Sequence, residues 1–150
     1  MEEAENRIET EEVLLDVTRK AVTDAVTEVT DLIDAELEKL DCPMKAQVQI
    51  NIVIDELFSN IVKYAYEEEG GGDARVIMKY CEPRGEVAIT FADSGEPYDP
   101  TEQEDPDITL PADQRGIGGL GILLVRKTMD EFSYEYKDGM NMKTIKKIIR

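Results

Sequence analysis

A carboxylate and a carboxamide lie four residues apart in the first half of the chain, at Glu56 and Asn60. In a helix, this spacing projects both side chains from one face. Such oxygen groups are ligands that Mg²⁺ accepts, and the carboxylate can also take a proton. The alternative is a solvated helix face. Apolar residues flank the pair on nearly every side, however, so two polar groups there need a reason. The neighbouring Asp55 lies about 100° away around the helix and is expected to face elsewhere.

A second candidate group is Asp93, in the sequence Asp93-Ser94-Gly95 at the end of a predicted strand. A carboxylate there can accept a hydrogen bond from an exocyclic amine, such as N6 of adenine. Gly95 has no side chain, so it would let the backbone approach a base closely. The alternative is an ordinary Asx turn, for which this sequence is favoured.

Glycines form a third candidate site, at Gly116, Gly118, Gly119 and Gly121, just before an apolar helical run. Their backbone N–H groups and the positive end of the helix can bind phosphates. Neither a dinucleotide-binding fingerprint nor a P-loop is present. A flexible hinge is the alternative for the glycines. Arg115, directly before them, is a candidate phosphate clamp, with a surface salt bridge as its alternative.

The elements that position these groups are predicted from apolar periodicity. Spacings of three and four predict two long helices, over residues 18–40 and 44–66. Alternation predicts an edge strand within 8–17 and two hairpins, with turns at 82–85 and 137–139. A short helix is expected over 119–129. Together these elements predict an α+β fold: a two-layer α/β sandwich with a mostly antiparallel sheet and three helices on one face.

Composition restricts the classes of function. A length of 150 residues fits one domain, 1–150, in which residues 1–7 are expected to be a flexible N-terminus. The net charge of −17 disfavours nucleic acid or an anionic membrane as a partner. No signal peptide or membrane span is expected, so we predict a cytoplasmic protein. With no histidine in the chain, histidine catalysis and phosphohistidine formation are excluded. Cys42 and Cys81 lack metal-ligand spacing and are expected to be buried free thiols.

In this order the three motifs resemble the ATP-binding boxes of the GHKL ATPase superfamily, and above all its anti-sigma factor serine kinases. Residues 56–66 (ELFSNIVKYAY) are similar to the N box of that branch. Residues 91–100 (FADSGEPYDP) resemble its first glycine box, and residues 118–130 (GGLGILLVRKTMD) its second. The resemblance covers about residues 8–150 and implies the Bergerat ATP-binding fold.

The resemblance also implies a role for each matching residue. Glu56 would be the general base, Asn60 a Mg²⁺ ligand and Asp93 the carboxylate that reads adenine. Gly95 would allow adenine to approach closely, and residues 97–117 would form an ATP lid. The remaining ATP-binding residues implied are Arg115, Gly116, Gly118, Gly119, Leu120 and Gly121. Tyr64 stands where the family often has histidine, which suggests a divergent subgroup.

Three functions are compatible with these residues. The first is a Mg-ATP-dependent serine kinase, whose partners by resemblance are a sigma factor and an anti-anti-sigma protein, and which is commonly a homodimer. The second is a regulatory binding module in which ATP orders the lid without phosphate transfer. The third is a simple ATPase, in which Glu56 orients a water. Retention of Glu56 and Asn60 favours an enzyme, because adenine recognition alone does not require a base.

Overall fold

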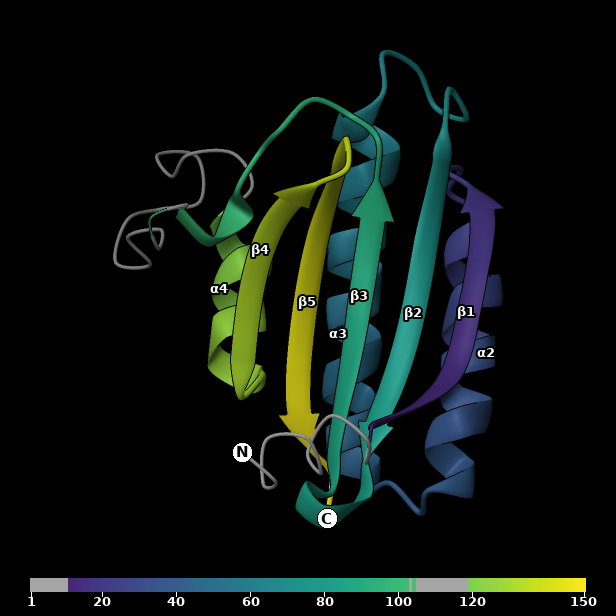
Figure 1. Cartoon of the computed structure of the whole chain (residues 1–150), viewed down its shortest axis with the longest axis vertical. Coiled ribbons are helices and arrows are strands. Elements are labelled where there is room, and N and C mark those ends of the chain that lie inside the picture. The colour runs from purple at the N-terminus through teal and green to yellow at the C-terminus, as the bar shows by residue number, and fades with distance from the viewer. Residues whose placement is uncertain (1–10, 103, 105–118) are drawn as a thin grey trace.

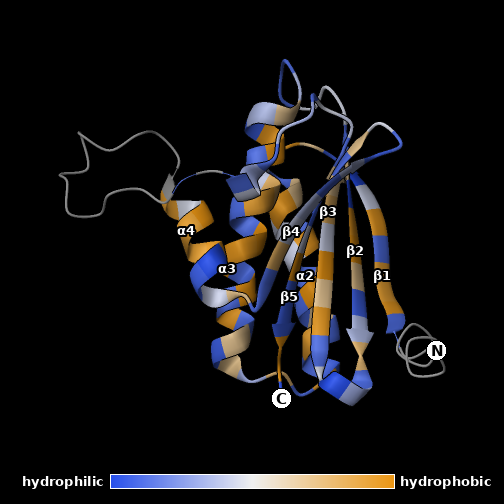
Figure 2. Ribbon diagram, turned by 60° about the vertical axis from the view of Figure 1, so that its left-hand side comes forward, coloured by the Kyte–Doolittle hydropathy of each residue, from blue (hydrophilic) through white to orange (hydrophobic). Residues whose placement is uncertain are grey.

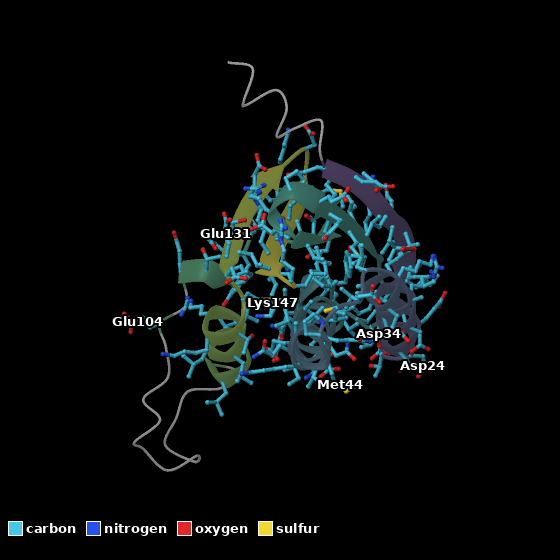
Figure 3. All side chains as sticks on the ribbon, turned by 90° about the horizontal axis from the view of Figure 1, so that it is seen from below. Asp24, Asp34, Met44, Glu104, Glu131 and Lys147 are labelled. Atoms are coloured by element: carbon cyan, nitrogen blue, oxygen red, sulfur yellow. The ribbon has the colours of Figure 1, made fainter. Side chains whose placement is uncertain are left out.

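The computed structural model describes residues 11–102, 104 and 119–150. These residues form two layers, a twisted sheet and a layer of three α-helices that covers one of its faces (Figures 1 and 3). The predicted α+β class with three helices on one face is thereby confirmed. Residues 1–7 and most of the 97–117 segment lie outside the described residues.

The sheet contains five strands, in the spatial order β1-β2-β3-β5-β4, and all neighbours are antiparallel. The strands are β1 (Glu11–Lys20), β2 (Asp73–Cys81), β3 (Glu86–Asp93), β4 (Glu131–Lys137) and β5 (Met140–Ile148). The α-helices are α2 (Ala25–Lys39), α3 (Met44–Asn60) and α4 (Gly119–Thr128). Both predicted hairpins form, β2–β3 and β4–β5. Their turns contain residues at positive φ, among them Gly85 (φ 60) and Gly139 (φ 76).

The beginning of the first helix was predicted wrongly. The edge strand β1 continues to Lys20, and α2 starts only at Ala25. Backbone pairing extends beyond the strand into the glycines before β2, since Ala21 N donates to Gly72 O at 2.9 Å and Gly70 N donates to Ala21 O at 2.9 Å. The helical spacing of apolar residues is a local pattern. It could not reveal these hydrogen bonds, because their partners are distant in sequence.

The central helix α3 buries more of its surface than one apolar stripe. Its fully buried side chains are Ile50, Val53, Ile54, Leu57 and Phe58. This helix lies between α2 and α4 and behind the middle of the sheet, so apolar side chains are covered on both flanks (Figures 1 and 2). The outer side of α3 stays exposed, as Met44 shows at the edge farthest from the sheet (Figure 3).

Cys42 and Cys81 are thiols and form no disulfide, as predicted. Cys81 is buried, whereas Cys42 is only partly buried, so the expectation of buried thiols was correct for one of them. Among the described residues, no helix has the length and apolar character required to cross a membrane.

Candidate functional site

Glu56 and Asn60 lie at the C-terminal end of α3, and both are half-buried. The amide nitrogen of Asn60 donates to Glu56 Oε1 at 3.1 Å. A carboxylate can only accept, so the Asn60 amide must present its nitrogen to Glu56 and its oxygen elsewhere. That oxygen is a suitable ligand for Mg²⁺, so the pair fits a metal ion. Asp55 is exposed and points away, as expected.

The helix widens directly after this pair. Residues Ile61–Ala65 form a single turn of π-helix, a local deformation that is common at functional sites. Ile61 and Val62 remain buried, while Tyr64, the residue that departs from the family pattern, has 69% of its surface exposed. Backbone from the end of this turn contacts the next motif, because a Cβ at Gly95 would overlap the Ala65 carbonyl. Gly95 is therefore required by a close approach of two chain segments, whether or not a base also lies near it.

Asp93 ends β3 and is only 2% exposed. Its Oδ1 accepts a hydrogen bond from Gly95 N at 2.9 Å, which makes the Asx turn that was the alternative interpretation of this sequence. The same oxygen accepts a second bond at 3.0 Å from the side chain of Asn141. The turn thus fixes the carboxylate at the end of the central strand β3 and leaves Oδ2 without a bond to this turn.

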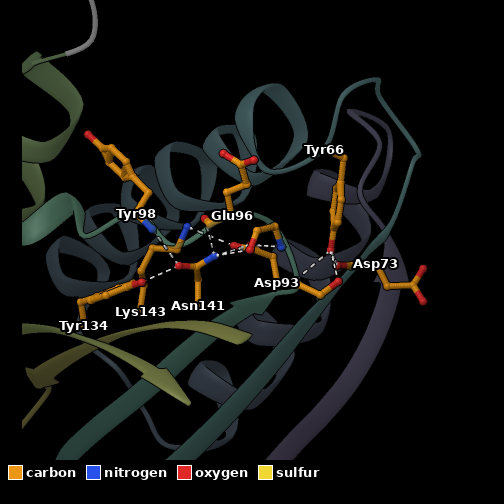
Figure 4. Close-up of polar contacts among 10 residues, drawn as sticks. Tyr66, Asp73, Asp93, Glu96, Tyr98, Tyr134, Asn141 and Lys143 are labelled. Atoms are coloured by element: carbon orange, nitrogen blue, oxygen red, sulfur yellow. Dashed lines mark hydrogen bonds and ion pairs between the residues drawn. The ribbon is translucent and has the colours of Figure 1, made fainter. Parts of the chain in front are cut away.

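Asn141 organises this end of the sheet, although sequence reasoning missed it (Figure 4). Its nitrogen also lies 3.1 Å from Gly95 O and 3.0 Å from Glu96 O. Its oxygen accepts from Tyr98 N at 3.0 Å and from the Tyr134 hydroxyl at 2.5 Å. Burial raises the pKa of the Tyr134 phenol above its ordinary value.

Lys143 is the second residue that the sequence analysis missed. It is 8% exposed, and its Nζ lies 3.5 Å from Asp93 Oδ2. Burial lowers the pKa of the Lys143 ammonium, and the nearby Asp93 charge opposes that shift. Asn141, Lys143 and Ile145 are the buried positions of β5. Two polar residues on the core-facing side of an alternating strand are the signal that could have identified them.

A cavity of about 550 Å³ opens between these groups, a size suited to a small ligand. Asn60 lines it at the α3 side, and Asp93 and Lys143 line it at the sheet side. Its lining residues are Leu57, Asn60, Ile61, Tyr64, Ala65, Asp93, Glu96, Pro97, Tyr98, Pro100, Ile122, Asn141 and Lys143. The arrangement provides apolar walls for a flat ring and polar groups at both ends.

The glycine motif is only partly within the described residues. Gly119 and Leu120 begin α4, and Gly121 lies against Glu56, because a Cβ at 121 would overlap the Glu56 carboxyl group. Leu120 is exposed at 46%. The predicted contacts of Arg115, Gly116 and Gly118 fall outside the described residues. The helix N-terminus of α4 is thus brought to the carboxylate of α3.

No group of three or more His, Cys, Asp or Glu side chains that could hold a metal occurs among the residues that the structure describes. Mg²⁺ in nucleotide sites commonly uses one or two protein ligands and takes others from phosphate and water. A single oxygen from Asn60 agrees with that pattern.

A two-layer sandwich with a buried Asp and an Asn on one cavity, and a Glu hydrogen-bonded to that Asn, is an arrangement that suits a nucleotide-binding domain. The chain belongs to the family of histidine kinase-like ATPase domains, whose family model matches residues 19–147. The resemblance stated from the three motifs is thereby confirmed, and the family implies the use of ATP.

Curated relatives carry the names of kinases. The chain is 33% identical over 96 residues to the serine/threonine-protein kinase BtrW of Bordetella bronchiseptica, covering 64% of this chain and 66% of that protein. It is 32% identical over 97 residues to the serine-protein kinase RsbW of Bacillus velezensis, covering 62% of this chain and 59% of that protein. The matched part therefore spans less than two thirds of each of these relatives.

Solved structures show the same fold. The RsbU and RsbW domains of Rv1364c from Mycobacterium tuberculosis superpose with a TM-score of 0.65 at 16% identity, covering 90% of this chain and 32% of that one. The SiaB–SiaC complex from Pseudomonas aeruginosa gives a TM-score of 0.61 at 17% identity, covering 99% and 96%. At these identities, the likeness establishes the architecture alone.

Proposed function

We propose that this chain is a Mg-ATP-dependent protein serine kinase of the anti-sigma factor type. The observation that carries the proposal is the position of Asn60 and Asp93 on one cavity, with Glu56 hydrogen-bonded to Asn60. The names of the curated relatives support the same activity. A protein with only a regulatory ATP site would not need a carboxylate next to its metal ligand.

In this mechanism Asp93 accepts a hydrogen bond from the exocyclic amine of adenine, and the apolar walls hold the ring. Asn60 would hold Mg²⁺, which would supply positive charge to neutralise the phosphates. The N-terminus of α4 directs its partial positive charge toward the same phosphates. Such local positive charge is needed because the chain as a whole carries −17.

Glu56 then acts on the acceptor serine. The serine oxygen forms a bond to the γ-phosphorus, the bond from that phosphorus to the β,γ-bridging oxygen breaks, and ADP leaves. Glu56 takes the proton of the serine hydroxyl, so the carboxylate must be ionised and close to the acceptor. Catalysis of this kind depends mainly on position and charge, and few protein groups are required.

The proposed partners rest on the resemblance to anti-sigma factor serine kinases. By that resemblance, the proposed acceptor is an anti-anti-sigma protein and the second partner is a sigma factor, with the kinase acting as a homodimer in the cytoplasm. The name of the SiaB–SiaC complex adds that one protein of this fold is part of a protein complex. We keep the roles implied by the resemblance for the remaining residues: phosphate contacts for Arg115, Gly116 and Gly118, and an ATP lid for residues 97–117.

The test combines binding with transfer. Calorimetry with ATP, with and without Mg²⁺, is paired with transfer of labelled γ-phosphate to a candidate anti-anti-sigma protein. Glu56→Gln should retain ATP binding and lose transfer by about 10²–10⁴-fold. Asp55→Asn removes the same charge from the exposed adjacent position and should change neither measurement.

Each alternative function predicts a different result. Unaltered transfer in Glu56→Gln would exclude Glu56 as the base. ATP binding without transfer to any serine would favour the regulatory module, and release of phosphate at the same rate with or without a protein acceptor would favour a simple ATPase. Absence of ATP binding at millimolar concentration would refute the site itself.

A further inference from the structure

Lys143 is a buried cation at the end of the cavity proposed to hold adenine. The proposed kinase mechanism does not use it. Its side chain comes from β5 and lies beside Asp93 on the cavity wall (Figure 4). Burying an ammonium group is costly unless hydrogen bonds and opposite charge compensate. The buried ammonium group of Lys143 nevertheless lies on the wall of the proposed ligand cavity.

Among the described residues, the Lys143 ammonium group has few bonding partners. Nζ has three N–H donors. Within the described part of the chain, the only group at ion-pair distance is Asp93 Oδ2, at 3.5 Å. The other Asp93 oxygen already accepts from Gly95 N and from Asn141. The pair therefore presents Oδ2 as an acceptor to the cavity and, next to it, donors of Lys143 that no described residue occupies.

An adjacent acceptor and donor match one edge of adenine. On that edge the exocyclic amine N6 is a donor, and the ring nitrogen N1 beside it is an acceptor. A carboxylate cannot donate a hydrogen bond and an ammonium group cannot accept one, so Asp93 alone can read only N6.

We propose that Lys143 is a second base-reading residue, which donates a hydrogen bond to N1 of adenine while Asp93 accepts one from N6. The inference rests on the proposed binding of ATP at this site. It assigns specificity to a residue outside the three motifs and makes recognition of the base a charge-assisted pair of contacts, stronger than bonds between neutral groups.

The test removes N1 from the ligand and the ammonium from the protein. Calorimetry compares ATP with 1-deaza-ATP, in which N1 is replaced by CH, and with 7-deaza-ATP as a ligand that is altered elsewhere on the ring. For the unmodified protein, loss of N1 should weaken binding roughly ten- to a hundredfold, the range for a hydrogen bond to a charged group. Replacement of N7 should have a much smaller effect.

The protein variant is Lys143→Met, which keeps the length of the side chain and removes its charge. The penalty for 1-deaza-ATP should fall to less than threefold in this variant. Lys146→Met removes the same charge from a less buried position of β5 and should retain the full penalty. Circular dichroism and thermal unfolding establish that each variant is folded.

The outcomes separate the inference from the proposed function. If the unmodified protein does not bind ATP, the proposed function fails. If it binds ATP and 1-deaza-ATP equally well, Lys143 does not read N1, and that result does not depend on any variant. An equal penalty in the unmodified protein and in folded Lys143→Met would also overturn the inference.

Discussion

Gly121 of α4 lies directly against Glu56 of α3. A Cβ added at residue 121 would overlap the carboxyl carbon and both oxygens of Glu56. The two helices pack side by side at this point, so the missing side chain makes the room that the carboxylate occupies. The glycine motif therefore has a packing function at the proposed base, besides the phosphate contacts expected of it.

Gly121→Ala should lower phosphate transfer by about 10²-fold, since a displacement near 1 Å of a catalytic group can cost that much. Alanine favours a helix by about 1 kcal/mol over glycine, so a loss of helix propensity cannot explain such a result. Transfer rates and thermal unfolding measure the two effects. Leu124→Ala, at an exposed position of the same helix, is the control and should retain activity. A rate for Gly121→Ala within twofold of the unmodified protein would contradict the prediction.

Asn60→Ala should weaken ATP binding in the presence of Mg²⁺ and have little effect in its absence. The reason is that the variant removes the proposed oxygen ligand of Mg²⁺ but leaves intact the end of the cavity proposed to hold adenine. Calorimetry with and without Mg²⁺ measures the difference. Asn51→Ala is the matched control, because Asn51 donates to Asp34 at 2.7 Å, away from the cavity lining. If Mg²⁺ strengthens binding equally in Asn60→Ala and the unmodified protein, Asn60 is not the ligand.

Asn141→Ala should destabilise the fold by about 2–4 kcal/mol, since it leaves several partly buried donors and acceptors without their partner. The groups affected include Tyr98 N, the Tyr134 hydroxyl and Asp93. Urea unfolding measures the change. Thr144→Val on the same strand removes one hydroxyl contact, to Thr90 at 2.8 Å, and should cost about 1 kcal/mol. Equal losses for the two variants would show that Asn141 does not organise this region.

The ion pair between Asp16 of β1 and Arg75 of β2 should make stability depend on acid pH. Arg75 donates to both carboxylate oxygens, at 2.9 and 2.7 Å, and these bonds hold the pKa of Asp16 below its ordinary value of 3.8. Because the folded pKa is the lower one, the stabilisation is present above pH 3.8 and is lost as the pH falls through the folded pKa.

Asp16→Asn should therefore lower the urea midpoint slightly at pH 7, the loss being small because the pair is exposed. The difference from the unmodified protein should shrink below pH 3.8. Asp55→Asn, at an exposed position of α3, should show no such convergence. A difference that is independent of pH would mean that the ion pair is not its cause.

The motifs and most elements could be predicted from the sequence because they depend on local spacing. Glu56 and Asn60 share a helix face whatever surrounds the helix, and both hairpins follow from alternation with turn residues between the strands. The charge of −17 and the lack of histidine likewise exclude classes of chemistry without any structure.

The partners of the site residues required the tertiary structure. Strand β5 inserts between β3 and β4, and that order places Asn141 directly opposite Asp93. Alternation identifies a strand but not its neighbour in the sheet, so the network around Asn141 and the proximity of Lys143 to Asp93 could not be predicted. The same limit applies to the start of α2, which pairing between Ala21 and Gly72 delays.

Gly95 and Gly121 show most clearly which features follow from the sequence and which from the tertiary structure. Sequence alone marks Gly95 and Gly121 as positions without a side chain and suggests that something approaches them closely. Only packing decides what does: the Ala65 carbonyl at Gly95 and the Glu56 carboxylate at Gly121. Residue type is a property of each position, whereas the group that fills the vacant space is set by how helices and strands distant in sequence come together.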